Sequence, residues 1–366
     1  MKFNLKEVFS NFQAEGTFNS GIPYGSGHIN DTFKVATSES DANNYILQKI
    51  NHHIFKNVPQ LQDNILRVTT HLREKIEKIP GADPKREILT LIPSLENKPY
   101  FKDHEGNYWR LYIFIENRSY DRVENSSQAF EGGKTFGRFQ FLLSDLKGDP
   151  LHETIPDFHN MEKRLNTFFN TIVKDPKKRV QLSKEQIKFV EVRASEMTLI
   201  QKLGEEGKIP LRITHNDTKF NNVLLDELDK GLCVIDLDTV MPGYIHYDFG
   251  DSIRTSTNTS NEDEKDLSIV EMNIQLFEAF SKGFLGETKS FLEPEEINNL
   301  AFSGKMMTFI IGLRFLTDYI DGDNYFKIHH HDHNLQRAKA QFKLVSSMER
   351  QYPEMQDIIE KIVEEI

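Results

Sequence analysis

The sequence predicts an α+β fold in which a strand-rich front is followed by a mostly helical remainder. Short runs that alternate apolar and polar residues, which are typical of strands, recur through roughly the first third of the chain. From Ser126 onward, apolar residues recur instead at helical spacing, apart from short apolar runs within residues 209–236. Because strands and helices come in separate blocks, the order favours an α+β fold over alternating βαβ units. We expect a first unit over residues 1–116 and a second, helical unit over residues 117–366.

The length, charge and cysteine content of the chain limit the kinds of partner and cellular compartment that we expect for it. A chain of 366 residues can bury a sizeable core, and its net charge of −11 argues against nucleic acid or an anionic membrane as partner. The N-terminal residues lack the apolar stretch of a signal peptide, and because no apolar run reaches 18 residues we expect no transmembrane span. We therefore expect a cytoplasmic protein that is a monomer or a weak oligomer. The single cysteine, Cys233, lies in the apolar run LCVI, so we expect it to be a buried thiol.

The periodicity places individual elements along both units. In the first unit we expect a short helix at Leu5–Phe12, strands at Thr17–Tyr24, Thr32–Ala36 and Tyr45–Ile50, a helix at Asn57–Ile79, and strands at Ile88–Pro93, Tyr100–Asp103 and Tyr108–Ile115. In the second unit we expect helices at Ala129–Leu146, Met161–Val173, Lys184–Leu203, Glu264–Phe284, Glu295–Ile320, Asn334–Arg350 and Glu354–Ile366. Pro294 suits the start of a helix.

A polar loop at residues 214–222 carries most of the candidate chemistry. Its sequence, THNDTKFNN, is too rich in Asn, Asp and Thr for the interior of a helix or strand. Apolar runs flank it, and loops between rigid flanks are where catalytic groups tend to lie. The runs at Val223–Leu225 and Leu232–Ile235 are expected to form a hairpin. This hairpin would bring Asp236 back beside Asn222 and Asp217.

Asp217, Asn222 and Asp236 together suit phosphoryl transfer with a magnesium ion. Carboxylate and amide oxygens are ligands that Mg²⁺ prefers. The pattern HxDxxxxN followed by an Asp at a strand end is that of kinase-type enzymes. We expect Asn222 and Asp236 to hold the metal and Asp217 to act as the base. The alternative is that each of the three only caps a turn.

Two further acidic residues follow the hairpin. Asp248 belongs to a DFG triplet, the metal motif of protein kinases, but it lies beyond Pro242–Gly243 and not at the end of the returning strand. We interpret Asp248 as structural and expect it to bond backbone groups near the polar loop. Asp238 is a weaker second metal candidate, because alternate strand residues share a face.

A glycine-bearing turn at residues 21–33 is the candidate phosphate lid. Gly25 and Gly27 would let backbone amides approach phosphate closely, although the form GxGxxN is not a Walker loop. The alternative is an ordinary hairpin turn. On the third strand, Lys49 is the candidate phosphate-pairing lysine, whereas Gln48 faces the opposite side and competes for the inward position. An exposed strand lysine is the alternative for Lys49.

The chain resembles the aminoglycoside phosphotransferase and choline kinase superfamily, and more closely its N-acetylhexosamine 1-kinases. Three motifs taken together carry this resemblance: THNDTKFNN, VIDLDTVMPG and DFGDSIR. The similarity extends over nearly the whole chain, including PYGSGHIN, YILQKIN and GLRFLTDYIDGDNYF. It implies a two-lobed, protein-kinase-like fold with a small β-rich N-lobe and a larger, mostly helical C-lobe. It also implies ATP and Mg²⁺ as cofactors, an amino sugar as acceptor and a sugar 1-phosphate as product.

The resemblance also implies roles for individual residues. Asp217 would take the proton of the anomeric hydroxyl, and Lys219 would neutralise the transferring phosphate. Adenine would dock at a hinge that includes Phe114 and Glu116. The residues implied in sugar binding are His28, Asn30, Arg314 and Tyr325.

Two features near the C-terminus have a second interpretation. Arg314 and Asp318 share a helix face, so a surface ion pair is the alternative to a place in the sugar pocket. Arg314 nevertheless lies in an apolar run, where a guanidinium needs a partner. The segment KIHHHDH suggests zinc, but it has no companion cysteine and no HExxH motif, so we expect a polar surface loop.

Two other functional classes stay open. Another small-molecule kinase of the superfamily, acting on choline, homoserine, methylthioribose or an aminoglycoside, would use the same Asp217, Asn222 and Asp236. A nucleotide-binding pseudokinase is the third possibility, and turnover separates it from the enzymes.

Overall fold

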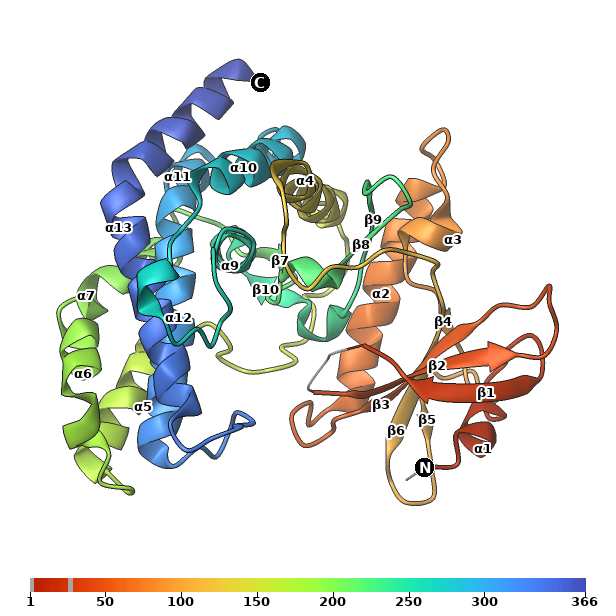
Figure 1. Ribbon diagram of the computed structural model, residues 1–366. Helices are drawn as coiled ribbons and strands as arrows, with labels where there is room; N and C mark the ends of the chain where they lie inside the picture. The colour runs from red at the N-terminus through yellow and green to blue at the C-terminus, as the bar shows by residue number, and fades with distance from the viewer. Residues whose placement is uncertain (1–2, 26–28) are drawn as a thin grey trace. The chain divides into compact units, whose positions relative to one another are not determined.

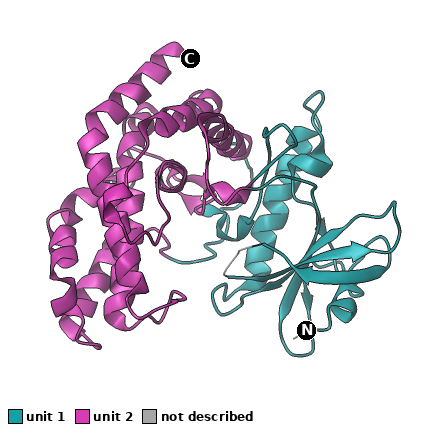
Figure 2. Cartoon of the chain, viewed as in Figure 1, with its two compact units in different colours: residues 1–119, 145–156, 224–241 teal, residues 120–144, 157–223, 242–366 magenta. Residues whose placement is uncertain are grey.

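The computed structural model describes residues 3–25 and 29–366, which form two compact units (Figure 2). The first unit comprises residues 1–119, 145–156 and 224–241, and the second comprises residues 120–144, 157–223 and 242–366. The first unit holds the main sheet and the second is mostly helical, which confirms the predicted α+β fold. The lobe boundary predicted at residue 116 stays a prediction.

Among the described residues of the first unit, six strands form one antiparallel sheet in the order β1–β2–β3–β6–β4, with β5 beside β6 (Figure 1). The elements are α1 (Leu5–Phe9), β1 (Phe18–Pro23), β2 (Asp31–Thr37), β3 (Tyr45–Ile50), α2 (Val58–Ile76), α3 (Pro84–Glu87), β4 (Leu91–Ile92), β5 (Phe101–Lys102), β6 (Tyr108–Ile113), β8 (Val223–Leu225), β9 (Gly231–Val234) and the 3₁₀ turn η3 (Leu237–Thr239). The predicted strands and helices of the front are confirmed, although several are shorter than predicted.

The strand register divides this sheet into two faces. Leu47 of β3 lies opposite Phe33 and Leu111, and their side chains pack with Phe9 of α1 in one buried cluster. Successive side chains of a strand point to opposite faces. Gln48 therefore lies on the face away from α1.

Two later segments of the chain return to the first unit and are held by backbone and amide contacts. The Asn64 side chain of α2 is fully buried, accepts a hydrogen bond from His152 N (2.9 Å) and donates to Val240 O (3.0 Å). Arg118 and Leu225 exchange two backbone hydrogen bonds of 2.8 Å. One buried amide thus fixes both returning segments, because an unpaired Asn at this site would be costly.

The predicted hairpin is present, since β8 pairs with β9. Asp226 shapes its turn, because its Oδ1 accepts hydrogen bonds from Leu228 N (2.8 Å) and Lys230 N (2.9 Å). Cys233 of β9 is 1% exposed, and burial raises the pKa of its thiol to about 12. The prediction of a buried thiol is confirmed.

The described residues of the second unit are mostly helical. Its helices are α4 (Ser126–Leu143), α5 (Met161–Lys174), α6 (Lys184–Glu191), α7 (Ala194–Met197), α8 (Leu199–Glu205), α9 (Ile245–Ser256), α10 (Ile274–Thr288), α11 (Pro294–Asn298), α12 (Leu300–Asp321) and α13 (His333–Glu365), with short 3₁₀ turns that include η2 (Phe220–Asn222) and η4 (Leu267–Ile269). Strands β7 (Arg212–Thr214) and β10 (Met241–Gly243) pair beside them.

Glycines let α4 and α10 pack backbone against backbone. A Cβ added to Gly133 of α4 would meet Phe280 O at 2.1 Å, and a Cβ added to Gly283 of α10 would meet Phe130 O at 2.1 Å. The two helices can lie this close only because both positions lack a side chain.

Helix α12 is the core of the second unit. By length and composition alone, this helix is long and apolar enough to cross a membrane, with a mean hydropathy of 1.3 in its apolar window. The sequence analysis did not identify this window. Of that apolar window, 89% is buried inside the protein. Burial against α9 and α13 accounts for its apolar composition, as in the core helix of a globular unit.

Several predicted helices differ from the structure. The helix expected at Glu264–Phe284 begins only at Ile274, where the Asn273 side chain accepts a hydrogen bond from Leu276 N (3.1 Å). The helix expected at Lys184–Leu203 is divided into α6, α7 and α8. The two helices expected on either side of Pro353 are one continuous helix, α13. Met348 and Met355, one on each side of the proline, are both fully buried, so core packing outweighs the lost hydrogen bond.

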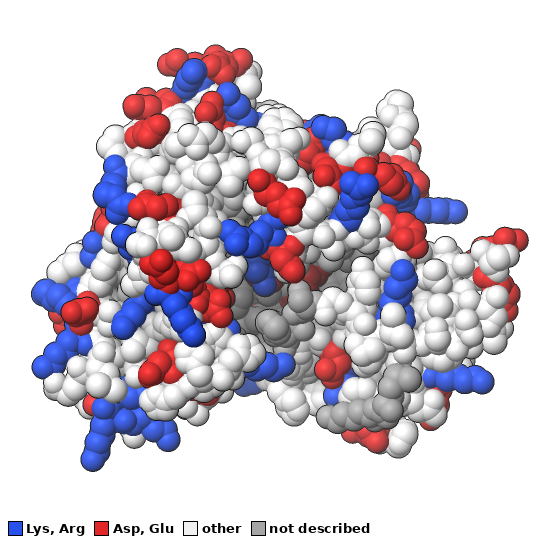
Figure 3. Space-filling model, in the orientation of Figure 1, with Lys and Arg blue, Asp and Glu red and all other residues white. Residues whose placement is uncertain are grey.

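Charged side chains of both signs are mixed on the face of the molecule drawn in Figure 3. Among the described residues on that face, Lys and Arg lie next to Asp and Glu and form no broad basic surface.

Candidate active site

The polar loop at residues 214–222 is fixed in the second unit by Asp248 of α9. The two carboxylate oxygens of Asp248 accept hydrogen bonds from His215 N (2.8 Å) and Asn216 N (2.7 Å), and Gln140 of α4 donates a third. Burial raises the pKa of Asp248 to about 6, an effect that these hydrogen bonds partly offset. The interpretation of Asp248 as a structural residue bonded to this backbone is confirmed.

Two histidines complete the support of this loop. The buried ring of His215 lies 5.8 Å from both Phe136 and Phe139 of α4, and its Nδ1 accepts a hydrogen bond from Asp217 N (3.3 Å). His159 bonds Asn216 O through Nε2 (3.0 Å), and burial lowers its pKa to about 3. His159 is therefore neutral and donates this bond. His159 was not predicted, because a histidine between two helices has no distinguishing pattern.

The loop presents Asp217 to solvent with two polar neighbours. The Asp217 side chain is 27% exposed, and Lys219 Nζ lies 3.2 Å from its Oδ2. Asn222 Nδ2 donates to Asp217 O (2.8 Å) and to Asp217 Oδ2 (3.3 Å). The Asn222 amide is thereby oriented so that its Oδ1 is the atom that remains for a cation.

Asp236 belongs to the first unit, in a turn that follows the hairpin. It is exposed, has a left-handed backbone conformation with φ of 60°, and directly precedes η3. Asn222 directly precedes β8, and Asp236 follows β9, the strand that pairs with β8. Among the described residues, no group of three or more His, Cys, Asp or Glu is placed to hold a metal ion.

The predicted second metal candidate, Asp238, forms a buried ion pair instead. Asp238 is 3% exposed. Arg110 of β6 donates hydrogen bonds to both of its carboxylate oxygens, and the bond from Nη2 to Oδ2 is 3.0 Å long. Asn30 Nδ2 also donates to Oδ2, at 2.6 Å. Asn30 Oδ1 in turn accepts a hydrogen bond from Asn51 N (2.9 Å). Both ends of the Asn30 amide are thus engaged within the first unit.

Lys49 and Gln48 lie on opposite faces of β3, as their adjacency predicted. Lys49 is on the face that α1 covers, with its Nζ 3.9 Å from Asp31 and 4.8 Å from the ring of Phe3. Gln48 is on the other face, where it accepts a hydrogen bond from Arg110 Nε (2.9 Å). Arg110 was missed by the sequence analysis, although an Arg within the apolar strand YWRLYI was a signal of a buried partner.

The other predicted nucleotide residues lie in the first unit. Gly25 is exposed in the turn between β1 and β2 and has φ of +77°, whereas Gly27 and His28 lie outside the described residues. The ring of Phe114 contacts Lys34 Nζ (3.5 Å to the centroid), which is on the same face as Gln48. Glu116 is exposed, and its carbonyl accepts a hydrogen bond from Arg86 (3.1 Å).

Arg314 of α12 is surrounded by aromatic rings in the second unit. Its guanidinium lies 5.1 Å from Phe158, 5.7 Å from Tyr325 and 5.5 Å from Phe326. The alternative of an ion pair with Asp318 is wrong, because that carboxylate bonds backbone amides of residues 324–326.

A second arginine, Arg164 of α5, accompanies Arg314 and was not predicted. It donates to Phe158 O from Nη2 (2.8 Å) and Nε (3.3 Å). Burial, together with the nearby charge of Arg314, lowers the pKa of Arg164 to about 10. The charges of Arg164 and Arg314 thus influence one another, and both also act on His159.

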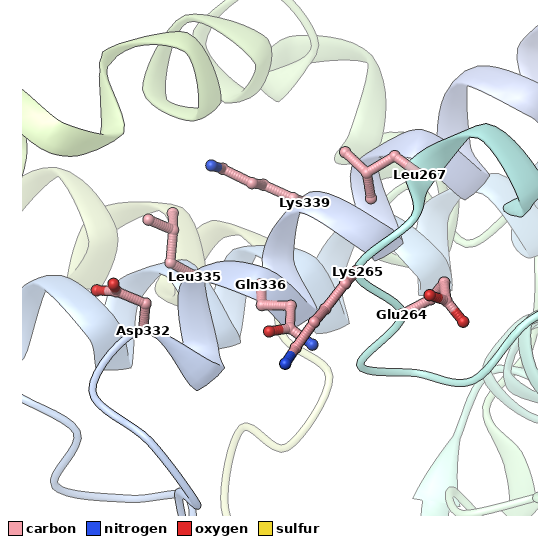
Figure 4. A pocket seen from close by; sticks show the side chains of 7 residues that line it. All are labelled: Glu264, Lys265, Leu267, Asp332, Leu335, Gln336 and Lys339. Carbon is pink, nitrogen blue, oxygen red and sulfur yellow. The ribbon is translucent and has the colours of Figure 1, made fainter.

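The histidine-rich segment is only partly the surface loop that was predicted. His331 is exposed and bonds Asp332 (2.8 Å), but His333 is buried at the start of α13 and pairs with Asp263 (3.1 Å). A nearby hollow of about 330 Å³ lies between the segment at residues 264–267 and α13 (Figure 4). None of the predicted site residues lines it.

Comparison with known proteins identifies the family. Residues 20–276, more than half of the chain, match the model of the phosphotransferase enzyme family, APH. The chain belongs to this family. As a member of the phosphotransferase family, it also resembles solved structures along nearly its whole length.

Three of these structures show the fold of this phosphotransferase. An aminoglycoside phosphotransferase from Alicyclobacillus acidocaldarius is 13% identical with a TM-score of 0.61, over 100% of this chain and 98% of that one. A spectinomycin phosphotransferase in complex with ADP and spectinomycin is 14% identical with a TM-score of 0.58, over 95% and 97%. Choline kinase from Cryptosporidium parvum is 14% identical with a TM-score of 0.58, over 93% and 91%. The predicted kinase-like fold, with an antiparallel sheet in the N-lobe and a helical C-lobe, is confirmed.

Proposed function

We propose that this phosphotransferase uses ATP and Mg²⁺ to phosphorylate the anomeric hydroxyl of an N-acetylhexosamine, which gives the sugar 1-phosphate. The observation that carries the proposal is the position of Asp217. Its carboxylate is partly exposed on a loop whose backbone is fixed by Asp248, and Asn222 and Lys219 contact it directly.

Asp217 would be the catalytic base. It would accept a hydrogen bond from the attacking hydroxyl and take its proton as the new P–O bond forms. An anomeric hydroxyl is more acidic than an ordinary alcohol, so a carboxylate suffices. Lys219, 3.2 Å from Asp217, would neutralise an oxygen of the transferring phosphate.

The oxygens of Asn222 and Asp236 would hold Mg²⁺. Asn222 fits this role because its Nδ2 is engaged by Asp217 while its Oδ1 is oriented away. When bound, the ion supplies charge neutralisation on the phosphate oxygens. The side chains of Asn222 and Asp236 would orient it, and Asp217 would remain available for the proton.

The nucleotide would bind in the first unit. Gly25 and Gly27 would bring backbone amides to the phosphates, and the segment with Phe114 and Glu116 would receive the adenine. Phe114 offers a ring for stacking, and Lys34 contacts that ring. This nucleotide assignment rests on the resemblance of the turn and on family membership.

The acceptor would bind at the arginine and aromatic cluster of the second unit. Arg314 would donate hydrogen bonds to sugar oxygens, and the exposed ring of Tyr325 would contact an apolar face of the sugar. Arg164 would add a second set of donors next to Arg314. The residues of the glycine turn that the resemblance implies in sugar binding are His28 and Asn30.

Phosphorus NMR of the protein with Mg·ATP and either N-acetylglucosamine or N-acetylgalactosamine tests the proposal. A new phosphate signal coupled to the anomeric proton is expected, and Asp217→Asn should abolish it. The matched control is Asp357→Asn, the same chemical change at an exposed residue of α13. Turnover only with choline, homoserine or an aminoglycoside would reject the hexosamine assignment, and nucleotide binding without any turnover would indicate a pseudokinase.

A further inference from the structure

The segment at residues 322–326 is bonded along its whole length to one residue, Asp318 of α12. The backbone oxygen of Asp318 accepts hydrogen bonds from the amides of Gly322 (2.9 Å) and Asp323 (2.8 Å). Its Oδ1 accepts from Asn324 N (2.9 Å) and Tyr325 N (2.8 Å), and its Oδ2 accepts from Phe326 N (3.0 Å). Five consecutive amides therefore point at a single residue.

The surroundings of Asp318 explain why a carboxylate is kept there. It is 6% exposed and lies in the last turn of α12, where the helix dipole disfavours negative charge. A buried carboxylate needs donors, and Asn334 Nδ2 of α13 adds one more at 2.9 Å to Oδ2. The chain can turn back on itself because Gly322 has φ of +112°. The carboxylate and the segment thus hold each other in place.

The segment carries two of the rings that surround Arg314. Tyr325 and Phe326 pack against each other with centroids 4.7 Å apart, and Phe326 packs on Phe315 of α12, also at 4.7 Å. Tyr325 is 60% exposed, so its backbone hydrogen bonds and its contacts with Phe326 and Arg314 determine its position. The backbone amides of Tyr325 and Phe326 both donate hydrogen bonds to the Asp318 carboxylate.

We infer that Asp318 is a positioning residue for the acceptor, which holds residues 322–326 so that Tyr325 and Phe326 complete the subsite around Arg314. This inference rests on the proposed function, in which Arg314 and Tyr325 contact the sugar. Asp318 itself touches neither substrate. Removing its charge should therefore loosen the segment and weaken acceptor binding while leaving nucleotide binding unchanged.

Amide hydrogen exchange of the protein without substrates tests whether Asp318 holds residues 322–326 in place. In Asp318→Asn, the amide nitrogen of the new side chain would face donors and not accept from them, so the amides of residues 324–326 should exchange at least about tenfold faster. Asp357→Asn, on an exposed face of α13, should leave these amides unchanged. Unchanged exchange in Asp318→Asn would overturn the inference.

Steady-state kinetics tests the functional half. We expect the acceptor KM of Asp318→Asn to rise at least about tenfold and the KM for Mg·ATP to stay within about twofold. Tyr325→Ala, at an exposed position that leaves the core intact, should reproduce the rise, and the double variant should show less than the sum of the two effects. An unchanged acceptor KM, or an equal rise in both KM values, would contradict a positioning role. If the wild type phosphorylates neither sugar, the proposed function fails and with it the link to the sugar, while hydrogen exchange still decides whether Asp318 holds the segment.

Discussion

Asn30 donates a hydrogen bond of 2.6 Å to Asp238, although 208 positions separate the two residues in the chain. Asn30 closes the glycine turn between β1 and β2, and Asp238 lies two residues after Asp236. Arg110 of β6 pairs with the same Asp238 carboxylate. The turn that carries the proposed metal ligand is thus fastened to the sheet and to the glycine turn by one buried carboxylate.

The first prediction concerns this buried pair. Arg110→Met should lower the free energy of unfolding by about 3–5 kcal/mol, because it leaves the Asp238 charge buried without its main partner. Arg118→Met is the control, since Arg118 forms an exposed pair with Asp229 at 3.5 Å and should cost less than about 1 kcal/mol. Urea unfolding of both variants measures the difference. An equal decrease in the free energy of unfolding of the two variants would contradict a larger contribution from the buried pair.

The second prediction concerns pH and Asp248. Burial raises its pKa from an ordinary value of 3.8 to about 6, so the native state binds the proton more tightly than the unfolded chain does. The contribution of this group to stability is therefore full below about pH 4 and is lost as the pH rises through about 6, an effect on the order of 3 kcal/mol. The stability of wild type relative to Asp248→Asn should fall by this amount across that interval. A difference that is constant with pH would contradict the raised pKa.

The third prediction concerns the contact between α4 and α10. Gly133→Ala should destabilise the protein by roughly 1–3 kcal/mol, because its Cβ would overlap Phe280 O. Gly286→Ala, on α10, is the matched control, since no atom lies within 4 Å of its added Cβ. It should be neutral or stabilise by up to about 1 kcal/mol. Thermal unfolding of the two variants should show shifts of different sign or clearly different size.

The fourth prediction separates Lys49 from Lys34. Lys49 lies on the face of the sheet that α1 covers, so Lys49→Met should leave the KM for ATP within about twofold of the wild type. Lys34 lies on the other face and contacts Phe114, so Lys34→Met should raise this KM several-fold. Steady-state kinetics with varied Mg·ATP distinguishes the two. A large effect at Lys49 alone would instead support Lys49 as the phosphate-pairing lysine.

The alternation of apolar and polar residues, and the residues typical of turns, correctly predicted strands and hairpins that a short stretch of sequence defines. The alternation of Tyr45–Ile50 and the turn residues after Leu225 identified β3 and the β8–β9 hairpin. The position of Asp248 beyond the returning strand led to the prediction that it bonds backbone near the polar loop, which the structure confirms. Its hydrogen bonds to the polar loop, 32 and 33 positions away, are an exception among the long-range contacts, because sequence reasoning anticipated them.

Contacts between distant segments were not predictable in the same way. Pro353 reads as a helix end, but Met348 and Met355 are buried together and α13 continues through it. Arg110 finds its partner Asp238 128 positions away. Asp318 seemed to pair with Arg314 by helical spacing, whereas its carboxylate bonds amides that follow the helix. In each case packing or a buried charge outweighs a local rule.

The burial of Cys233 has a practical consequence for spectroscopy. Thiol reagents attack the thiolate, and this single cysteine is 1% exposed with a pKa raised by burial to about 12. A cysteine introduced at an exposed position such as Val173, which is 86% exposed, would therefore react alone. Fluorophores or spin labels can be attached site-specifically to the otherwise native sequence, without first removing its own thiol.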